Sequence, residues 1–154
     1  MLTYEVGLLA QGRKNLLGLL KAFSVEQLNQ VPTGFKNNLV WNFGHIIVSH
    51  QILCYKNAGL PPVVPSSYIE LYKRGTFPEQ AVGTEHIEAL KVFAIETIAK
   101  FKEDYQNGKF SEYQRYQSLY GVAINSIEDA VKFNVVHEGI HMGYILSLSK
   151  LISN

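Results

Sequence analysis

Apolar residues recur at steps of three and four through most of this chain, and no stretch shows a sustained alternation of period two. That spacing places apolar side chains along one face of an α-helix, whereas a half-buried strand requires alternation. The pattern predicts four long amphipathic helices, over about residues 2–22, 38–57, 84–107 and 126–152. We therefore expect an all-α protein.

Capping residues and breakers mark the ends of these helices. Ser24 to Gln27 has the form of a capping box and predicts a short turn of helix after the first long one. Asn107-Gly108 is suited to a left-handed cap at the end of the third. Residues that can cap the N-termini of the later helices are Asn37 or Asn38, Thr84 and Ser126.

Two long connections separate the helices. Residues 61–80 contain prolines and serines and predict an irregular crossover with room for one helical turn, and the aromatic-rich residues 110–123 predict a second irregular connection. A chain of 154 residues can bury roughly two-thirds of its unfolded surface. We expect one domain over residues 1–154, a four-helix bundle with long crossover connections, in which metal sites are built from side chains that project inward.

Charge and composition exclude several classes of protein. Lys and Arg total 14 against 13 Asp and Glu, so the chain lacks the basic excess that binding to a phosphate backbone requires. Apolar runs are far shorter than the ~20 residues of a membrane-spanning helix. The single Cys54 cannot form an internal disulfide, and the first residues lack the pattern of a signal peptide. We expect a cytoplasmic protein with neither nucleic acid nor membrane as a partner.

His137 and His141 lie four residues apart in the last predicted helix. This spacing puts the two imidazoles on one face, roughly 40° apart and about 6 Å along the axis, within reach of one metal ion. The segment from His137 to His141 also matches His-Glu-x-x-His, the zinc-binding helix of many metallopeptidases. Such enzymes need a third ligand, usually downstream, but the 13 residues after His141 contain no His, Asp, Glu or Cys. The peptidase interpretation is therefore disfavoured.

A third ligand must then come from upstream, where three more histidines occur. His45 lies among apolar neighbours in the second helix, where an unpaired imidazole would be costly, and it is the best candidate. His50 is about 140° further around that helix and is expected at the edge of the bundle, while His86, in the first turn of the third helix, is expected at the surface. Three histidines and one open position form a catalytic rather than a closed structural zinc site.

The order and separation of these motifs resemble the DinB-like (DinB/YfiT) family of bacterial four-helix proteins. An Asn-x-x-Trp-x-x-Gly-His-Ile-like segment precedes a His-Glu-x-x-His-x-Gly segment, and the similarity extends over essentially the whole chain. Many members have Gly-Gln after the last histidine, whereas Tyr144 follows the glycine here. The matching residues are Asn38, Trp41, Gly44, His45 and Ile46, followed by His137, Glu138, His141 and Gly143.

The resemblance implies a divalent metal, nickel or zinc, bound by His45, His137 and His141, and frequently a homodimer. It also implies, for some relatives, transfer or isomerisation that uses low-molecular-weight thiols such as bacillithiol or mycothiol. A bound metal lowers the pKa of a water or thiol, and a thiolate is both the better metal ligand and the reactive form. The alternative is a non-catalytic metal-binding or interaction module in which the ion joins two helices.

Other residues near the predicted site allow two interpretations each. Glu138 is either a general base or second-shell partner, or an exposed helix charge about 100° from His137. Asn134 and Tyr144, each about one turn from a histidine, are expected to border the same face and contact a small-molecule thiol or electrophile, unless they only pack. Trp41 and the tyrosines line either a pocket or the core. Cys54 is expected to be a buried, inert thiol.

Overall fold

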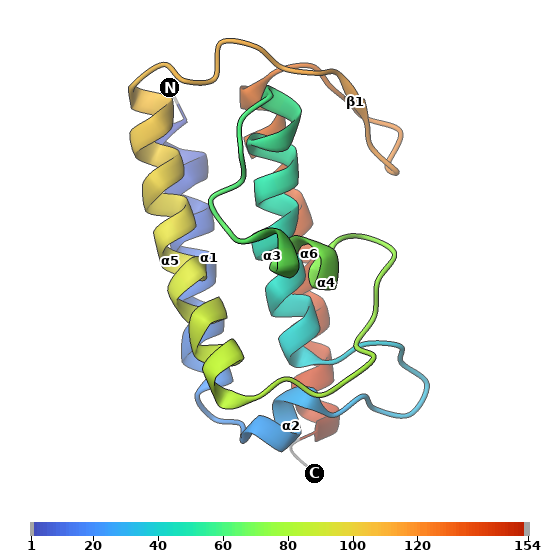
Figure 1. Cartoon of the computed structure of the whole chain (residues 1–154). Helices are drawn as coiled ribbons and strands as arrows, with labels where there is room; N and C mark the ends of the chain where they lie inside the picture. Colours follow the sequence, from blue (N-terminus) through green and yellow to red (C-terminus); the bar gives the residue numbers. More distant parts are fainter. Residues whose placement is uncertain (1, 153–154) are drawn as a thin grey trace.

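The computed structural model describes residues 2–152 and consists mostly of helices (Figure 1). Four of them are long and run side by side: α1 (Thr3–Leu20), α3 (Leu39–Cys54), α5 (Thr84–Gln106) and α6 (Ile127–Ile152). The short elements are α2 (Val25–Asn29), the 3-10 turn η1 (Lys56–Ala58), α4 (Ser66–Tyr72), and the antiparallel strands β1 (Tyr116–Gln117) and β2 (Ala123–Ile124). The predicted all-α bundle is confirmed.

Most of the predicted caps are present. The Asn38 side chain accepts a hydrogen bond from the Trp41 amide at the start of α3, and Ser126 accepts one from Asp129 at the start of α6. The capping box at Ser24 opens α2. The prediction for Thr84 is wrong, because Gly83 occupies the capping position of α5 and no side chain caps that end. The start of α5 is therefore set by tertiary packing rather than by a local side-chain hydrogen bond.

The two long connections carry more structure than the sequence predicted. The first includes α4, a helix of seven residues that packs against α3. The second is tied to the end of α3, because the Tyr113 hydroxyl donates to the Leu53 carbonyl and the Gln114 amide to the Asn57 carbonyl. It then forms the small β1–β2 hairpin at the end of the bundle away from α2 (Figure 1). Two-residue strands are too short to produce an alternating pattern in a sequence.

The most buried of the long helices is α3, which contacts α6, α5, α4 and α2. Every residue of α3 is buried except Ser49 and Ile52. His50, predicted at the bundle edge, is therefore fully buried, and that prediction is wrong. An angular argument on a single helix cannot foresee this result, because it assumes that one face of the helix stays in solvent.

Gly44 allows a close approach between α3 and the end of α4. A Cβ atom at this position would lie 2.5 Å from the ring of Tyr72, a distance that side chains do not tolerate. The Tyr72 ring therefore packs directly on the α3 backbone at Gly44. The backbone carbonyl of Tyr72 contacts the next residue of that helix, His45. Within residues 2–152, no helix is both long enough and apolar enough to span a membrane.

Candidate metal centre

Three histidines from two helices converge inside the bundle. His45 comes from α3, and His137 and His141 come from α6. One ring nitrogen of each lies within 4.8 Å of the corresponding nitrogens of the other two. Their ring centroids are 4.6 to 5.2 Å apart, and the ring planes are tilted by 54° to 57°. Rings in this arrangement point one nitrogen each at a common position, as the ligands of one cation do.

Hydrogen bonds fix which nitrogens are free to bind. The Nδ1 of His45 lies 2.7 Å from the Tyr72 carbonyl oxygen, which can only accept, so this nitrogen carries the proton. The Nδ1 of His141 lies 2.9 Å from Asn42 Oδ1, and the Asn42 amide nitrogen donates to two other carbonyls, which confirms that its oxygen faces the histidine. Both rings therefore hold an Nε2 lone pair, the arrangement typical of metal-binding histidines.

His137 has no such partner. Its Nδ1 is buried, and within residues 2–152 no group accepts or donates a hydrogen bond to it. A buried ring nitrogen without a partner is unfavourable, and within residues 2–152 His50 Nε2 is another such nitrogen. Because the other two rings are already oriented by acceptors, a cation among the three nitrogens fits the donor set. With its proton on Nδ1, His45 accepts a hydrogen bond at Nε2 from the Ser49 hydroxyl at 3.3 Å, and a bound metal would replace this contact.

Burial keeps all three imidazoles neutral at neutral pH. Burial, together with the neighbouring His141 and His45, lowers the pKa of His137 to about 3. Burial and the nearby His45 lower the pKa of His141 to about 4. Burial also lowers the pKa of His45, against the opposing effect of the Tyr72 carbonyl. Neutral imidazole is the form that binds a metal.

Aromatic rings pack around the histidines. Trp41, in the apolar core, stacks on His45 with the ring centroids 4.7 Å apart and the planes within 11°. Phe133 stacks on His137 and in turn contacts Tyr120. Trp41 is thus part of the core and also lines a cavity beside α4, so both interpretations of this residue apply, and its ring packs against a ligand ring.

A cavity of about 300 Å³ opens beside the three histidines. Its walls come from α3, the start of α6 and the β1–β2 segment, with one contribution from the loop after α4. This volume is at the lower end of the range of small-molecule sites. A group bound at the histidine nitrogens would therefore share the cavity with the rest of a small molecule.

The family assignment agrees with this geometry. A model of the DinB superfamily matches residues 8–145. The chain belongs to the DinB superfamily. No curated protein shows significant sequence similarity to it. The three histidines of this DinB-superfamily protein all lie within the matched residues.

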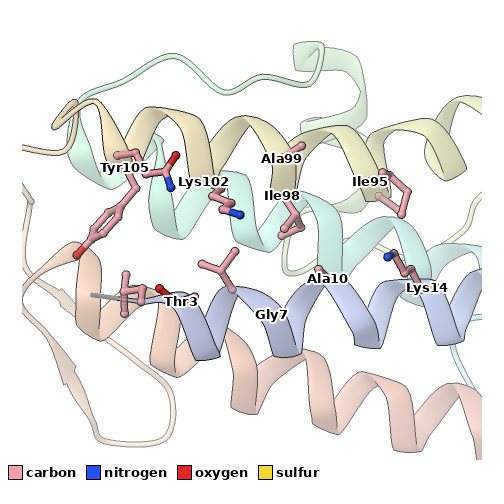
Figure 2. Close-up of a pocket in the computed structure, with 13 residues that line it drawn as sticks. Thr3, Gly7, Ala10, Lys14, Ile95, Ile98, Ala99, Lys102 and Tyr105 are labelled. Carbon is pink, nitrogen blue, oxygen red and sulfur yellow. The ribbon is translucent and has the colours of Figure 1, made fainter.

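A larger cavity, of about 660 Å³, lies elsewhere in the DinB fold (Figure 2). It runs between α1 and α5 and is lined mainly by apolar side chains such as Val6 and Ile98, with Lys14 and Lys102 along it. Its lining contains no histidine, cysteine or acid. The lining of this groove therefore lacks the residue types that usually bind a metal, so size alone does not identify the metal site.

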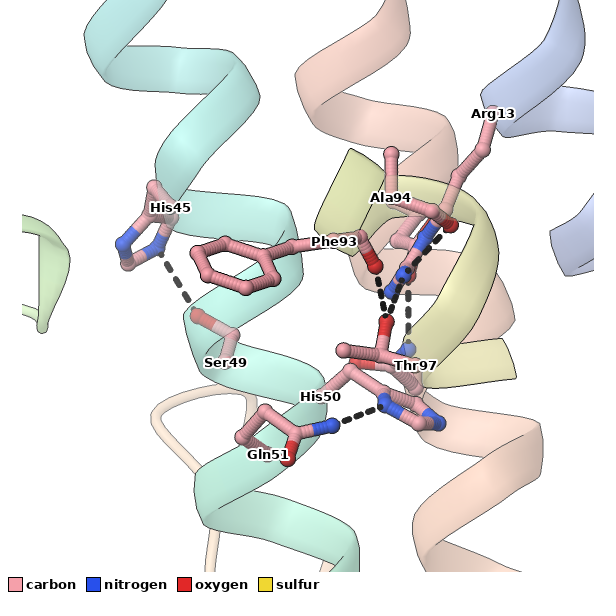
Figure 3. Close-up of polar contacts among 10 residues, drawn as sticks. Arg13, His45, Ser49, His50, Gln51, Phe93, Ala94 and Thr97 are labelled. Carbon is pink, nitrogen blue, oxygen red and sulfur yellow. Dashed lines mark hydrogen bonds and ion pairs between the residues drawn. The ribbon is translucent and has the colours of Figure 1, made fainter. Parts of the chain in front are cut away.

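Glu138 belongs to a second buried cluster. Its carboxylate accepts from Arg13 Nη2 at 2.7 Å and Nε at 3.2 Å, and from the Asn134 amide at 2.9 Å. Arg13 Nη1 also donates to Thr97 and to the Ala94 carbonyl, on α5. Figure 3 shows Arg13 with its α5 partners on a different side of α3 from His45. Glu138 is 5% exposed, so its interpretation as an exposed helix charge is wrong.

The remaining predicted contacts of Glu138, Asn134 and Tyr144 differ from expectation. Asn134 is buried, and its side-chain amide donates a hydrogen bond to Glu138. Tyr144 packs edge-on against Phe35. None of the three lines the histidine cavity. Their predicted roles in catalysis and binding stay predictions, without a contact that supports them.

The other histidines and Cys54 have ordinary packing roles. The side-chain amide nitrogen of Gln51 lies within hydrogen-bond distance of His50 Nδ1, and the His50 ring lies edge-on to Phe101. His86, predicted at the surface, is half-buried, stacks on Tyr68 and bonds the Tyr72 hydroxyl, so that prediction is wrong. Cys54 is fully buried as expected, and burial raises the pKa of its thiol.

Proposed function

We propose that this protein is a divalent-metal-dependent enzyme of the thiol-dependent S-transferase or isomerase type, with His45, His137 and His141 as the ligands of zinc or nickel. The observation that supports this most is the convergence of three neutral imidazoles beside a cavity of about 300 Å³. A closed structural site would not need space next to the ligands.

When bound, the metal supplies a Lewis acid that lowers the pKa of a thiol in the cavity. The protein's own residues orient and shield that chemistry. Tyr72 and Asn42 hold two of the imidazoles in the tautomer that leaves Nε2 free. Phe133 and Tyr120 form an aromatic wall that limits the access of water to the ligand rings.

The cavity lining favours a thiol over a water as the activated group. Within residues 2–152 the lining contains no Asp or Glu, and Glu138 is bound to Arg13 and Asn134 instead. A hydrolase of the His-Glu-x-x-His type uses such a carboxylate as its base. A thiol has an ordinary pKa of about 8.5, so a modest decrease gives thiolate at neutral pH without a carboxylate. The second substrate is then a small electrophile.

Metal analysis tests the site. We expect about one equivalent of metal in the purified wild-type protein and in His86→Gln, which alters a histidine outside the cluster. The triple variant His45→Ala, His137→Ala, His141→Ala should contain almost none. Equal metal content in the triple variant and the control would overturn the assignment.

A second measurement separates a reactive ion from a structural one. We expect cellular low-molecular-weight thiols to change the visible absorption of the cobalt-substituted protein, and His45→Ala to fold without metal. No spectral change with any such thiol, together with unfolding of His45→Ala, would favour the alternative of a non-catalytic module in which the ion joins α3 to α6.

We also propose that the protein forms a homodimer through the outer face of α6. Val136, Ile140, Leu146 and Leu151 of that helix are each about half exposed. Gly139 and Gly143 lie between them with open space where a Cβ atom would be, so a second helix can approach closely. Sedimentation of Val136→Glu should show monomers, whereas the equally exposed Val92→Glu on α5 should remain dimeric. Identical behaviour of the two variants would exclude this face.

A further inference from the structure

The histidine cavity has one charged side chain in its lining besides the histidines. This residue is Arg74, from the loop after α4, and no Asp or Glu lines the cavity. Within residues 2–152, Arg74 makes no ion pair, whereas its neighbour Lys73 pairs with Glu70. Since Arg74 is exposed and His45 is buried, the guanidinium lies toward the solvent end of the cavity.

A tight turn holds the backbone of Arg74. The Thr76 amide donates to the Lys73 carbonyl at 3.2 Å, and Gly75 has a φ of 90°, which a residue with a side chain rarely adopts. The Thr76 hydroxyl lies 2.8 Å from the carbonyl oxygens of Leu71 and Lys73. These contacts close the turn, so the position from which the Arg74 side chain starts is fixed.

The same segment is connected to the metal ligand His45. Trp41, which stacks on His45, donates from its ring nitrogen to the Thr76 hydroxyl at 3.2 Å. The carbonyl of Tyr72, two residues before Arg74, accepts the hydrogen bond from His45 Nδ1. The residues that orient His45 are therefore also the residues that position the Arg74 turn. The cation and the histidines belong to one connected unit.

We infer that the cavity binds a small molecule with two recognition groups: one that ligates the metal at the histidines, and a carboxylate or phosphate that pairs with Arg74. The inference rests on the proposed function and names the class of thiol or electrophile. A divalent metal ion and the Arg74 guanidinium, with no acid in the lining, would give the cavity a net positive charge. Arginine binds planar oxyanions through two parallel hydrogen bonds, which also fixes the orientation of the guest.

Two thiols that differ only in charge test this anion site. Cobalt-substituted protein is titrated with 3-mercaptopropionate and with 3-mercaptopropionamide, and the dissociation constants are taken from the visible spectrum. We expect the carboxylate to bind more tightly, and Arg74→Gln to weaken it about tenfold while the affinity for the amide stays unchanged. Lys73→Gln is the matched control, because it removes the adjacent cation, which does not line the cavity.

The control separates local recognition from general electrostatics. If Arg74→Gln and Lys73→Gln weaken the carboxylate equally, or if the wild-type protein does not distinguish the two thiols, the inference is overturned. Neither substitution affects a buried group, so both variants should fold.

Failure of the proposed function gives a different result. If neither thiol changes the cobalt spectrum, thiol chemistry is excluded, and succinic monohydroxamate against acetohydroxamate then tests the anion site. A preference for succinic monohydroxamate that Arg74→Gln abolishes supports the inference, and no preference overturns it.

If the protein takes up no cobalt, calorimetric titration with inorganic phosphate replaces both pairs of ligands. Binding lost in Arg74→Gln but kept in Lys73→Gln supports the anion site, and its absence in the wild-type protein overturns it.

Discussion

Two buried polar clusters on neighbouring faces of α6 differ in how completely their charged and ring groups are satisfied. In the cluster of Arg13, Glu138, Asn134 and Thr97, both carboxylate oxygens of Glu138 and every nitrogen of the guanidinium have partners, and within residues 2–152 only the Asn134 side-chain oxygen of this cluster has none. In the cluster of His45, His137 and His141, three ring nitrogens face one another, and one buried nitrogen of His137 has no partner within residues 2–152. The three histidines of the second cluster line a cavity of about 300 Å³.

The difference shows how one sequence motif can serve two purposes. The His-Glu-x-x-His segment spans both clusters, because successive residues of a helix point about 100° apart. Its histidines face α3 and the cavity, whereas its glutamate faces Arg13 on α1. In a peptidase the glutamate would reach the metal side. Here it joins α6 to α1, and through Arg13 to α5.

The largest effect is expected when the Arg13–Glu138 ion pair is broken. Arg13→Ala would leave the Glu138 carboxylate buried without its cation, and we expect the free energy of unfolding to fall by about 3–5 kcal/mol in urea denaturation. Replacing both partners, as in Arg13→Met with Glu138→Leu, should restore most of that loss, because no uncompensated charge remains. If Arg13→Ala lowers the free energy of unfolding by less than about 1 kcal/mol, the ion pair does not hold α1 and α6 together.

An intermediate effect is expected at the histidine cluster. Asn42→Ala removes the acceptor for His141 Nδ1 and should weaken metal binding about 10- to 100-fold, measured by competition with a chelator. Asn42→Asp keeps an acceptor oxygen and should bind metal more tightly than Asn42→Ala. The double variant of Arg13 and Glu138 should keep wild-type affinity. If that variant loses metal as much as Asn42→Ala does, the two clusters are not independent.

A third expected effect is a dependence of stability on pH in the metal-free protein. The folded-state pKa values of His137 and His141, about 3 and 4, lie below the ordinary value of 6.5. Between pH 6.5 and about 4 the unfolded chain therefore binds more protons, and the free energy of unfolding falls as the pH falls. Thermal melts from pH 7 to 5 should show this decrease.

Substitutions in the two clusters should show which groups cause this pH dependence of stability. His137→Gln should reduce the slope, because one of the titrating imidazoles is gone, while the double variant of Arg13 and Glu138 should keep it. Saturating metal should also reduce the slope, since it holds the imidazoles unprotonated. A slope that is the same in wild-type protein and His137→Gln would show that other groups control the acid response.

Local patterns sufficed for the helices and for the outline of the site. Apolar periodicity predicted the four long helices, and the spacing of His137 and His141 predicted a shared face. Predictions based on the angle around one helix were less reliable. His50 was placed at the bundle edge by such an angle, but it is buried because α3 has neighbours on several sides.

The groups that complete the candidate site had weaker signals or none. The Tyr72 carbonyl is a backbone atom, and its position depends on the packing of α4 on Gly44. Asn42 lies one helical turn before His45, yet its partner is His141, 99 residues away. Arg13 and Arg74 are arginines in unremarkable segments, and only their surroundings distinguish them.

The sequence by itself determined the helices, their caps and the three candidate ligands, because these follow from the period of 3.6 residues and from the local chemistry of side chains. The tertiary structure alone decided which polar groups are satisfied and which remain open, since partners such as Arg13 and Glu138 are 125 residues apart. Satisfaction of a buried polar group depends on what surrounds it in three dimensions.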